Sequence, residues 1–227
     1  MFEGQFFPKQ PIQFEGSGKK IALPFSLAYG STSVQDAPAS SPHSFTGMTI
    51  GAAPSGGQTR HVVAAIGLMH NSAGSIDSVT IGGISATLVV GIDSGTGAAG
   101  AGVALYIAEV PTGTTAIVAV SFTNGTSVGA ATYILMNKTA DTANSSSTVE
   151  DPTLNLNIAA GGVAIGVSMV RDGTVSTWTG LTEDFDTDIR SNEWFSGAHG
   201  GSAGTPASVS LSRGTSSQKA AAVASFA

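Results

Sequence analysis

The 227-residue chain contains no cysteine, which excludes disulfides, thiolate metal sites and cysteine nucleophiles. Ionic side chains are also scarce, since charged residues make up 11% of the chain against about a quarter of a typical soluble protein. Only nine residues are Lys or Arg, and the net charge is −6. We therefore expect no basic patch, no direct binding of nucleic acid and no attraction to anionic membrane surfaces.

Long apolar runs are missing as well. The longest of them, such as residues 62–69, are far shorter than the ~20 residues that a membrane-spanning helix needs. Residues 1–8 lack the cationic and continuous apolar regions of a secretion signal. We therefore expect the protein to be made and folded in a cytoplasm, without a membrane partner.

Residues 1–46 differ in composition from the rest of the chain. Four of the ten phenylalanines lie in the first fourteen residues, where two prolines disfavour both helices and strand ladders. These phenylalanines are Phe2, Phe6, Phe7 and Phe14. Each ring that is buried on a neighbouring surface contributes about 1.5–3 kcal/mol. We predict an extended arm with a Pro/Ser-rich hinge at 31–46; it docks on another subunit or, as the less favoured alternative, folds back over its own domain.

From residue 47 onward the sequence has the pattern of β-strands. Apolar and small residues alternate with a period of two through 103–108, 117–122 and 163–169. No segment shows a sustained helical period with caps at both ends. About a dozen short strands predict an all-β fold, in which antiparallel sheets pack as a β-sandwich of jelly-roll or Ig-like type over residues 47–227.

Two further features bear on the arrangement of these strands. The segments 61–69 and 77–82 are separate strand candidates, and Asn124-Gly125 between two alternating runs is typical of a hairpin turn. Between Arg60 and Lys138 the chain has no Lys or Arg, although exposed sheet faces usually carry charges that prevent association. We expect other subunits to cover these charge-poor faces, the alternative being that small side chains alone keep them soluble.

Motifs of catalysis are absent from the sequence. It has no nucleophile elbow, no zinc-binding His-Glu-x-x-His, no P-loop and no dinucleotide fingerprint. The four histidines are scattered, at positions 43, 61, 70 and 199, and surface or packing roles are expected for them. We expect no cofactor and no enzymatic activity.

One segment concentrates acidic residues. Asp184, Asp186 and Asp188 have the spacing of a calcium loop, but Ile189 replaces the turn glycine, which excludes an EF-hand. A looser calcium site and a glycosidase pair of carboxylates remain open as alternatives. The favoured interpretation is a strand with an acidic outward face.

The only two tryptophans, Trp178 and Trp194, flank this acidic segment. If they are exposed, they can stack on a sugar ring while Asp184 and Asp186 accept hydrogen bonds from its hydroxyls. If they are buried, they are the largest side chains of the core. Core packing is favoured, and a glycan site is the alternative.

Two phrases of the sequence resemble β-sandwich structural proteins of tailed bacteriophages. They are SVTIGGISATLVV at 78–90 and ALYIAEVPTG at 104–113, followed by a strand that ends at Ser121-Phe122. The resemblance covers about residues 60–227 and includes no catalytic motif. It implies a virion component, such as a capsid decoration (cement) protein, a head fibre, or a tail or baseplate subunit, and proteins of this type commonly extend terminal arms over neighbouring subunits.

These observations lead to one functional hypothesis. We expect a non-enzymatic virion structural protein, most of all a capsid decoration protein, that is assembled in the host cytoplasm. It is expected to bind the major capsid protein or another virion protein through residues 1–46 and its charge-poor sheet faces, and to form a homo-oligomer, with a cyclic trimer as the symmetry we expect. The alternative is a carbohydrate-binding or receptor-binding tail domain.

Overall fold

The structure of the protein is a computed structural model. It describes residues 23–38, 40–94, 99–139, 145–148, 153–171, 176–201, 206–212 and 218–227. These residues form strands and no helix, so the predicted all-β class is confirmed. In particular, the described part has no helix that is long and apolar enough to cross a membrane. Residues 1–22, with all four phenylalanines of the predicted arm, lie outside the described residues.

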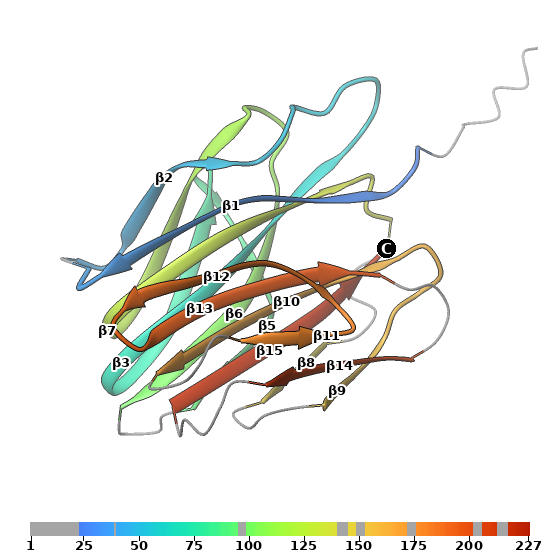
Figure 1. Cartoon of the computed structure of the whole chain (residues 1–227). Helices are drawn as coiled ribbons and strands as arrows, with labels where there is room; N and C mark the ends of the chain where they lie inside the picture. Colours follow the sequence, from blue (N-terminus) through green and yellow to red (C-terminus); the bar gives the residue numbers. More distant parts are fainter. Residues whose placement is uncertain are drawn as a thin grey trace, which may run out of the picture.

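The strands follow one another along the chain without intervening helices (Figure 1). They are β1 (Ser26–Asp36), β2 (His43–Thr49), β3 (Arg60–Ile81), β4 (Ile84–Ser85), β5 (Thr87–Asp93), β6 (Gly100–Glu109), β7 (Thr115–Met136), β8 (Ser145–Thr148), β9 (Thr153–Asn157), β10 (Val163–Arg171), β11 (Thr177–Thr179), β12 (Thr182–Arg190), β13 (Glu193–Gly200), β14 (Pro206–Ser212) and β15 (Gln218–Phe226).

The described strands form three sheets. A seven-stranded sheet has the order β1-β7-β3-β6-β5, with β2 added to β7 and β4 added to β3. A five-stranded sheet has the order β12-β13-β10-β15-β8, and a three-stranded sheet has the order β11-β14-β9. The strand pairs are antiparallel. The seven- and five-stranded sheets pack against each other, which confirms the predicted β-sandwich.

β3 and β7 are long strands that fold over on themselves. Each has 22 residues, and the register between them shifts at His70 and again before Ser75. The two expected strands at 61–69 and 77–82 are therefore parts of one strand. The predicted hairpin at Asn124-Gly125 is wrong, because this dipeptide lies inside β7, where Asn124 has a positive φ of 54°. A left-handed residue here belongs to an irregularity within a strand rather than to a turn.

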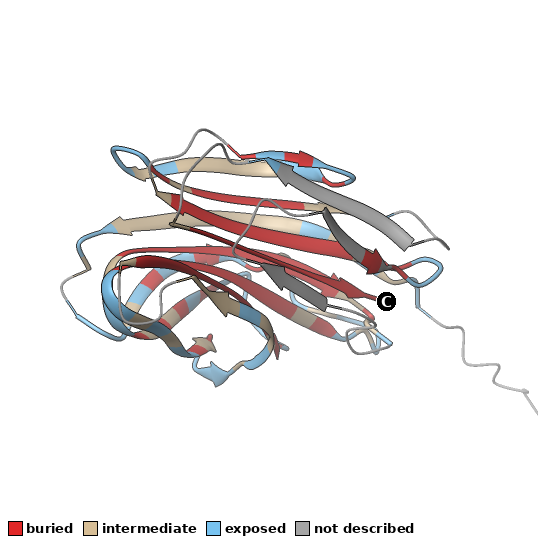
Figure 2. Cartoon of the chain, turned by 90° about the horizontal axis from the view of Figure 1, so that it is seen from below, coloured by how far each residue is buried: buried red, intermediate tan, exposed pale blue. Residues whose placement is uncertain are grey.

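The strands are stacked in layers (Figures 1 and 2), and three clusters of buried apolar residues hold them together. The second half of β3 pairs with the first half of β7. This pair packs on the first half of β3 and the second half of β7 through Val62, Ile66, Val79 and Val118, among others. The opposite face of the seven-stranded sheet packs on the five-stranded sheet. The outer face of the five-stranded sheet in turn packs against residues that include Leu156.

This layering covers the central charge-poor strands with other layers of the same chain. Alternate residues of β3 such as Val62 and Val63 are both fully buried, and Ala104 and Leu105 of β6 are buried as well. In these central strands the scarcity of charge follows from burial on both faces. Charge-poor surface stays exposed elsewhere, as at Leu88 of β5 and Ile117 of β7, so the expectation that other subunits cover such faces stays a prediction.

The β-structure also begins earlier than the composition predicts. The expected hinge at 31–46 overlaps β1, which pairs with β7 from Ser26 to Asp36, and β2, which pairs with β7 from His43 to Thr49. Prolines and serines of this segment lie mainly between the two strands. The sandwich therefore starts at β1 rather than at residue 47.

Glycines inside the strands make room for aromatic rings. Gly67 of β3 and Gly129 of β7 are cross-strand partners, and Phe195 of β13 packs over both. A Cβ atom would lie 2.6 Å from this ring at Gly67 and 2.5 Å from it at Gly129. Since real Cβ atoms do not approach so closely, only glycine fits the ring at these two positions. The pair of glycines fixes how the two main sheets stack.

A fully buried arginine at the start of β3 links two loops of the seven-stranded sheet. Arg60 is 0% exposed, and its guanidinium donates hydrogen bonds of 2.6–3.1 Å to six backbone carbonyl oxygens. These acceptors are in two loops, at residues 50–52 and at Val110, Thr112 and Gly113. Arg60 thus joins the loop that follows β2 to the connection between β6 and β7.

Candidate functional site

The acidic segment forms β12, the outer strand of the five-stranded sheet. β12 pairs with β13, and the register shifts between Glu183 and Phe185 and between Asp188 and Arg190. The first shift leaves Asp184 as an extra residue in the strand. Because of this bulge, Asp184 and Asp186 face different neighbours, although they are two residues apart.

Asp184 lies between the two main sheets, next to aromatic side chains. Its side chain is 6% exposed, and one carboxylate oxygen is 2.6 Å from Nδ1 of His199. The buried hydroxyl of Tyr133 lies beside Asp184, and burial followed by the charge of Asp184 raises the pKa of Tyr133 well above its usual value. This cluster is an Asp-His pair without a hydroxyl nucleophile bonded to the histidine among the described residues, so it lacks a component of a catalytic triad.

Asp186 points to the other face of β12. Its Oδ2 accepts a 2.7 Å hydrogen bond from the backbone N–H of Ser176, while the buried Oδ1 has no hydrogen-bond partner. Burial raises the pKa of Asp186 to about 7; the Ser176 hydrogen bond acts in the opposite direction, and the charge of Glu183 adds to the rise. Near neutral pH this carboxyl is thus able to bind a proton.

The two tryptophans have different surroundings. Trp178 is buried, its Nε1–H donates a 2.7 Å hydrogen bond to the hydroxyl of Ser196, and its ring packs over Gly166. Trp194 is partly exposed and lies across from Asp188 in the strand pair. Core packing, the favoured interpretation, therefore describes Trp178.

The structure separates the four residues of the expected glycan site. Trp178 and Asp184 are engaged in internal contacts, and they cannot serve as a stacking platform and a hydroxyl ligand. Asp186 and Trp194 are partly exposed, and the register places them on one face of the β12–β13 pair. Among the described residues, no group of three or more His, Asp or Glu is placed to hold a metal ion. A looser calcium site therefore finds no support in the described part of this segment.

A second polar cluster lies at the end of the sandwich where β3 and β7 fold over; we call it the bent end. Arg171 of β10 pairs with Glu193 of β13 at 3.0 Å, and the second carboxylate oxygen of Glu193 accepts a 2.5 Å hydrogen bond from Ser127 of β7. Arg171 also contacts Asn71 and Thr126. The cluster links the five-stranded sheet to the seven-stranded sheet across their interface.

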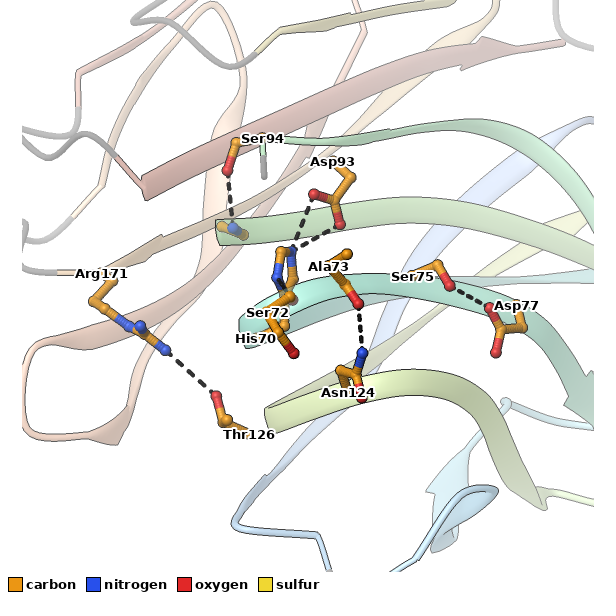
Figure 3. A network of polar contacts seen from close by, with 11 residues as sticks. His70, Ser72, Ala73, Ser75, Asp77, Asp93, Ser94, Asn124, Thr126 and Arg171 are labelled. Atoms are coloured by element: carbon orange, nitrogen blue, oxygen red, sulfur yellow. Dashed lines mark hydrogen bonds and ion pairs between the residues drawn. The ribbon is translucent and has the colours of Figure 1, made fainter. Parts of the chain in front are cut away.

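The same end carries a buried histidine (Figure 3). His70 is fully buried; its Nδ1 is 2.6 Å from the carbonyl oxygen of Ser72, and its Nε2 is 3.0 Å from both carboxylate oxygens of Asp93. Asn124 donates a hydrogen bond to the Ala73 carbonyl oxygen nearby. These contacts satisfy the backbone where β3 leaves its regular ladder. They hold the fold of the strand and leave the imidazole enclosed, away from any substrate.

The two sides of the sandwich differ in how their outer strands are protected. On one side, β12 carries five charged residues and two bulges, and Arg190 forms a 3.6 Å ion pair with Asp36 of β1. On the other side, β5 (TLVVGID) has one charged residue and pairs with β6 only, with no described strand on its other edge. Charges and bulges are the usual means by which proteins prevent edge-to-edge pairing.

Hollows adjoin β5 at both of its ends. One hollow has a volume of about 200 Å³ and is lined by Leu88, Ile76 and Tyr106 among others. The other has a volume of about 440 Å³ and is lined by Thr87 and Ile107 among others. The open strand thus lies next to space that side chains of an added segment can fill.

The local sequence does not indicate the roles of several of these residues. Arg60, His70 and Glu193 act through partners that are far away in the chain, as in the contact between Glu193 and Ser127. Its place before a long run without Lys or Arg is the one feature of the sequence that singles out Arg60. β5 is visible as an apolar run, but its position at an edge depends on pairings that the sequence does not specify.

Comparisons of the chain with protein-family models, with curated proteins and with solved structures found no match.

Proposed function

We propose that the protein is a non-enzymatic structural component of a tailed-phage virion, most of all a capsid decoration protein. In this proposal, residues 1–22 attach it to the major capsid protein, to another virion protein or to further copies of itself. The proposal keeps the attachment through the N-terminal segment. It also keeps as contact surfaces the charge-poor faces that stay exposed, such as those of β5 and of the first half of β7.

The observation that carries the proposal is that the described residues supply three apolar clusters of their own. These clusters contain buried rings such as Phe45, Phe195 and Phe226. Phe2, Phe6, Phe7 and Phe14 lie outside the described residues. Four phenylalanines within fourteen residues, in addition to these clusters, favour docking on another molecule, since apolar groups gathered in this way mark interaction sites.

The arrangement of the two ends of the sandwich supports the same proposal. The start of β1 pairs with the end of β7, and Thr139 donates a backbone hydrogen bond to Ala227, so the start of β1 and the C-terminus share one end of the molecule (Figure 1). The bent end, with Arg171 and Glu193, lies at the other. A protein attached through the segment that precedes β1 would present its polar bent end away from the attachment point.

Replacing the four phenylalanines tests this proposal. We expect the full-length protein with Phe2, Phe6, Phe7 and Phe14 all changed to Ser to lose particle binding, because each lost ring removes about 1.5–3 kcal/mol of burial. Occupancy is measured by quantitative gel analysis of purified particles after incubation with each protein. The matched control changes the same four residues to Leu, which preserves apolar character and is expected to retain most of the occupancy. Full occupancy by the Ser variant would contradict the proposal.

A second candidate is carbohydrate binding at the face of β12 and β13. The partial exposure of Trp194 beside Asp188 favours it, since an aromatic ring next to a carboxylate suits a sugar. Binding of host polysaccharides measured by isothermal titration calorimetry, abolished by Trp194→Ala and retained by Trp194→Phe, would favour this function over a purely structural one.

A further inference from the structure

β5 is the outer strand of the seven-stranded sheet on the side opposite β1, and it pairs with β6 only among the described strands. Leu88 in this strand is 53% exposed, and no Lys, Arg or Glu occurs in β5. Thr87–Ile92 have no ladder partner beyond β6 among the described strands. Such an edge offers unpaired N–H and C=O groups, which form a template for another strand.

The surroundings of β5 suit an added strand with large apolar side chains. In recognition by strand addition, main-chain hydrogen bonds supply affinity and pockets for alternate side chains supply specificity. The hollow beside Leu88 is lined by Ile76, Ile92, Val103 and Tyr106, and its one charged residue is Asp93. The 440 Å³ hollow at Thr87 lies at the other end of the strand and is more polar, with His61, Glu109 and Lys138 in its lining. The hollow beside Leu88 suits a phenyl ring, and the second hollow offers a ring space beside the aliphatic Ile107 and Ala108.

The chain itself contains a segment with matching properties. Residues 2–7 (FEGQFF) include three phenylalanines and no proline, so they can form ladder hydrogen bonds over a length close to that of β5. Residues 1–22 contain three Lys and two Glu, a net charge of +1, so the rest of the chain has a net charge of −7. Opposite net charges favour the approach of residues 1–22 as a whole to the sandwich, whereas residues 2–7 themselves carry the single charge of Glu3.

The length of the N-terminal segment allows it to reach the β5 edge of its own copy or of an adjacent copy. β1 and β5 lie at opposite sides of the seven-stranded sheet, separated by β7, β3 and β6, which corresponds to about 19 Å at ~4.8 Å per strand. A segment of 22 residues reaches up to roughly 70 Å. The proposed function, in which this segment attaches the protein to another molecule, selects the adjacent copy.

We propose that residues 2–7 of one copy add a strand to the open edge of β5 in a second copy, with their phenyl rings in the hollows beside Leu88 and Thr87. This inference rests on the proposed function and names the surface that the N-terminal segment binds. The contact is heterologous, since segment and edge are different surfaces. Repeated around an axis, it closes a ring such as the expected trimer.

Cysteine cross-linking tests the contact directly, because the chain has no cysteine of its own. Full-length Gln5→Cys is mixed with full-length Thr87→Cys or Leu88→Cys under mild oxidation, and peptide mass spectrometry identifies disulfides between the two positions. The control partner is Ile117→Cys, which is 49% exposed but lies on β7. We expect at least about tenfold more cross-linked product with the β5 variants than with the control. Equal yields would overturn the proposal.

A substitution on the edge provides an independent readout. Leu88→Lys introduces a charge of the kind that blocks edge pairing, and it is expected to weaken self-association at least about tenfold in sedimentation equilibrium. Ile117→Lys, at similar exposure, is expected to leave self-association unchanged. Wild-type association of Leu88→Lys would overturn the assignment of β5. Cross-linking within single chains of a Gln5→Cys/Thr87→Cys double variant at high dilution would overturn the contact between copies.

The outcomes separate this inference from the proposed function. If the four-Ser variant loses association while Leu88→Lys keeps it, the N-terminal segment binds elsewhere and the β5 assignment is wrong, whereas the proposed function stands. If both variants associate with themselves and with particles as the wild type does, the inference and the proposed function both fail.

Discussion

Arg60 shows at the scale of one residue how this protein satisfies its buried backbone. Its guanidinium binds six carbonyl oxygens of two loops while the side chain is fully buried. A planar group with five N–H donors can bind two loops at once, whereas the ammonium of lysine has three donors at one point. The sequence marks Arg60 only as the last Lys or Arg before a long run without either residue.

We expect Arg60→Met to lower the free energy of unfolding by at least about 3 kcal/mol, because it leaves several buried carbonyl groups without donors. Arg60→Lys is expected to recover only part of this loss. Urea unfolding followed by circular dichroism measures both values. Arg190→Met, at an exposed ion pair, is the matched control with an expected change below about 1 kcal/mol; equal effects at the two arginines would contradict this role.

The glycine pair under Phe195 gives a second prediction. Gly129→Ala places a methyl group 2.5 Å from the Phe195 ring, and such overpacking costs typically about 1–3 kcal/mol. Combining Gly129→Ala with Phe195→Leu is expected to restore part of the loss, since the smaller side chain leaves room for the methyl group. Chemical unfolding of the single and double variants measures the coupling. Strict additivity would show that ring and glycine do not interact.

Asp186 predicts a dependence of stability on pH. The pKa of Asp186 is about 7 in the folded protein against 3.8 when unperturbed, so the fold favours the protonated form. Stability is therefore greatest below pH 4, falls as the pH rises toward 7, and is constant above this range as far as Asp186 is concerned. Without solvent screening, this pKa difference corresponds to about 4 kcal/mol in the free energy of unfolding. Screening at this half-buried group reduces the contribution to about 1–2 kcal/mol.

We expect Asp186→Asn to raise the free energy of unfolding by about 1–2 kcal/mol at pH 8 relative to pH 4. Urea titrations at the two pH values measure this difference, and Asp188→Asn on the same strand supplies the baseline for loss of a charge. A gain that is the same at both pH values, or larger at pH 4, would show that Asp186 is not protonated in the fold.

At the scale of elements, local patterns and long-range pairing differ in how well the sequence reveals them. The alternating segments 103–108, 117–122 and 163–169 lie in β6, β7 and β10, as predicted. The hairpin expected at Asn124-Gly125 fails because β3 runs beside both halves of β7. Turn chemistry is local, while the pairing that overrides it joins residues far apart in the chain.

The same difference between local pattern and long-range pairing applies to the candidate site. The acidic strand at 183–190 is visible from composition, but the bulge that turns Asp184 inward and leaves Asp186 on the outer face is not. Trp178 and Trp194 look equivalent in the sequence. In the structure the ring of Trp178 packs over Gly166, whereas Trp194 is partly exposed. The fate of each side chain depends on which strand lies opposite, and that information is absent from the local pattern.

The layered packing predicts an order of local stability. Amides in the first half of β3, at 62–69, lie between two ladders with both faces buried, and they should exchange with solvent only on global unfolding. β12 has one ladder and two register shifts, so its amides should exchange first. Hydrogen-deuterium exchange with mass spectrometry measures the order. Faster exchange in 62–69 than in β12 would contradict this picture of the core.

At the scale of the whole molecule, the sandwich has a terminal end, where β1 begins and the chain finishes, and a polar bent end. On one side of the sandwich, the charges of β12 oppose edge-to-edge pairing. On the other side, β5 has no described partner strand beyond β6. This asymmetry suits a subunit that repeats in one orientation around a symmetric shell, where weak contacts gain strength by multiplicity.

Electron microscopy of phage particles labelled with antibody against this chain tests the central proposal most directly. We expect label at many symmetry-related positions on the particle, and loss of this label from particles produced with the four-Ser variant in place of the wild-type chain. Label on no particle, with all of the chain recovered as a free monomer from the same lysate, would contradict it.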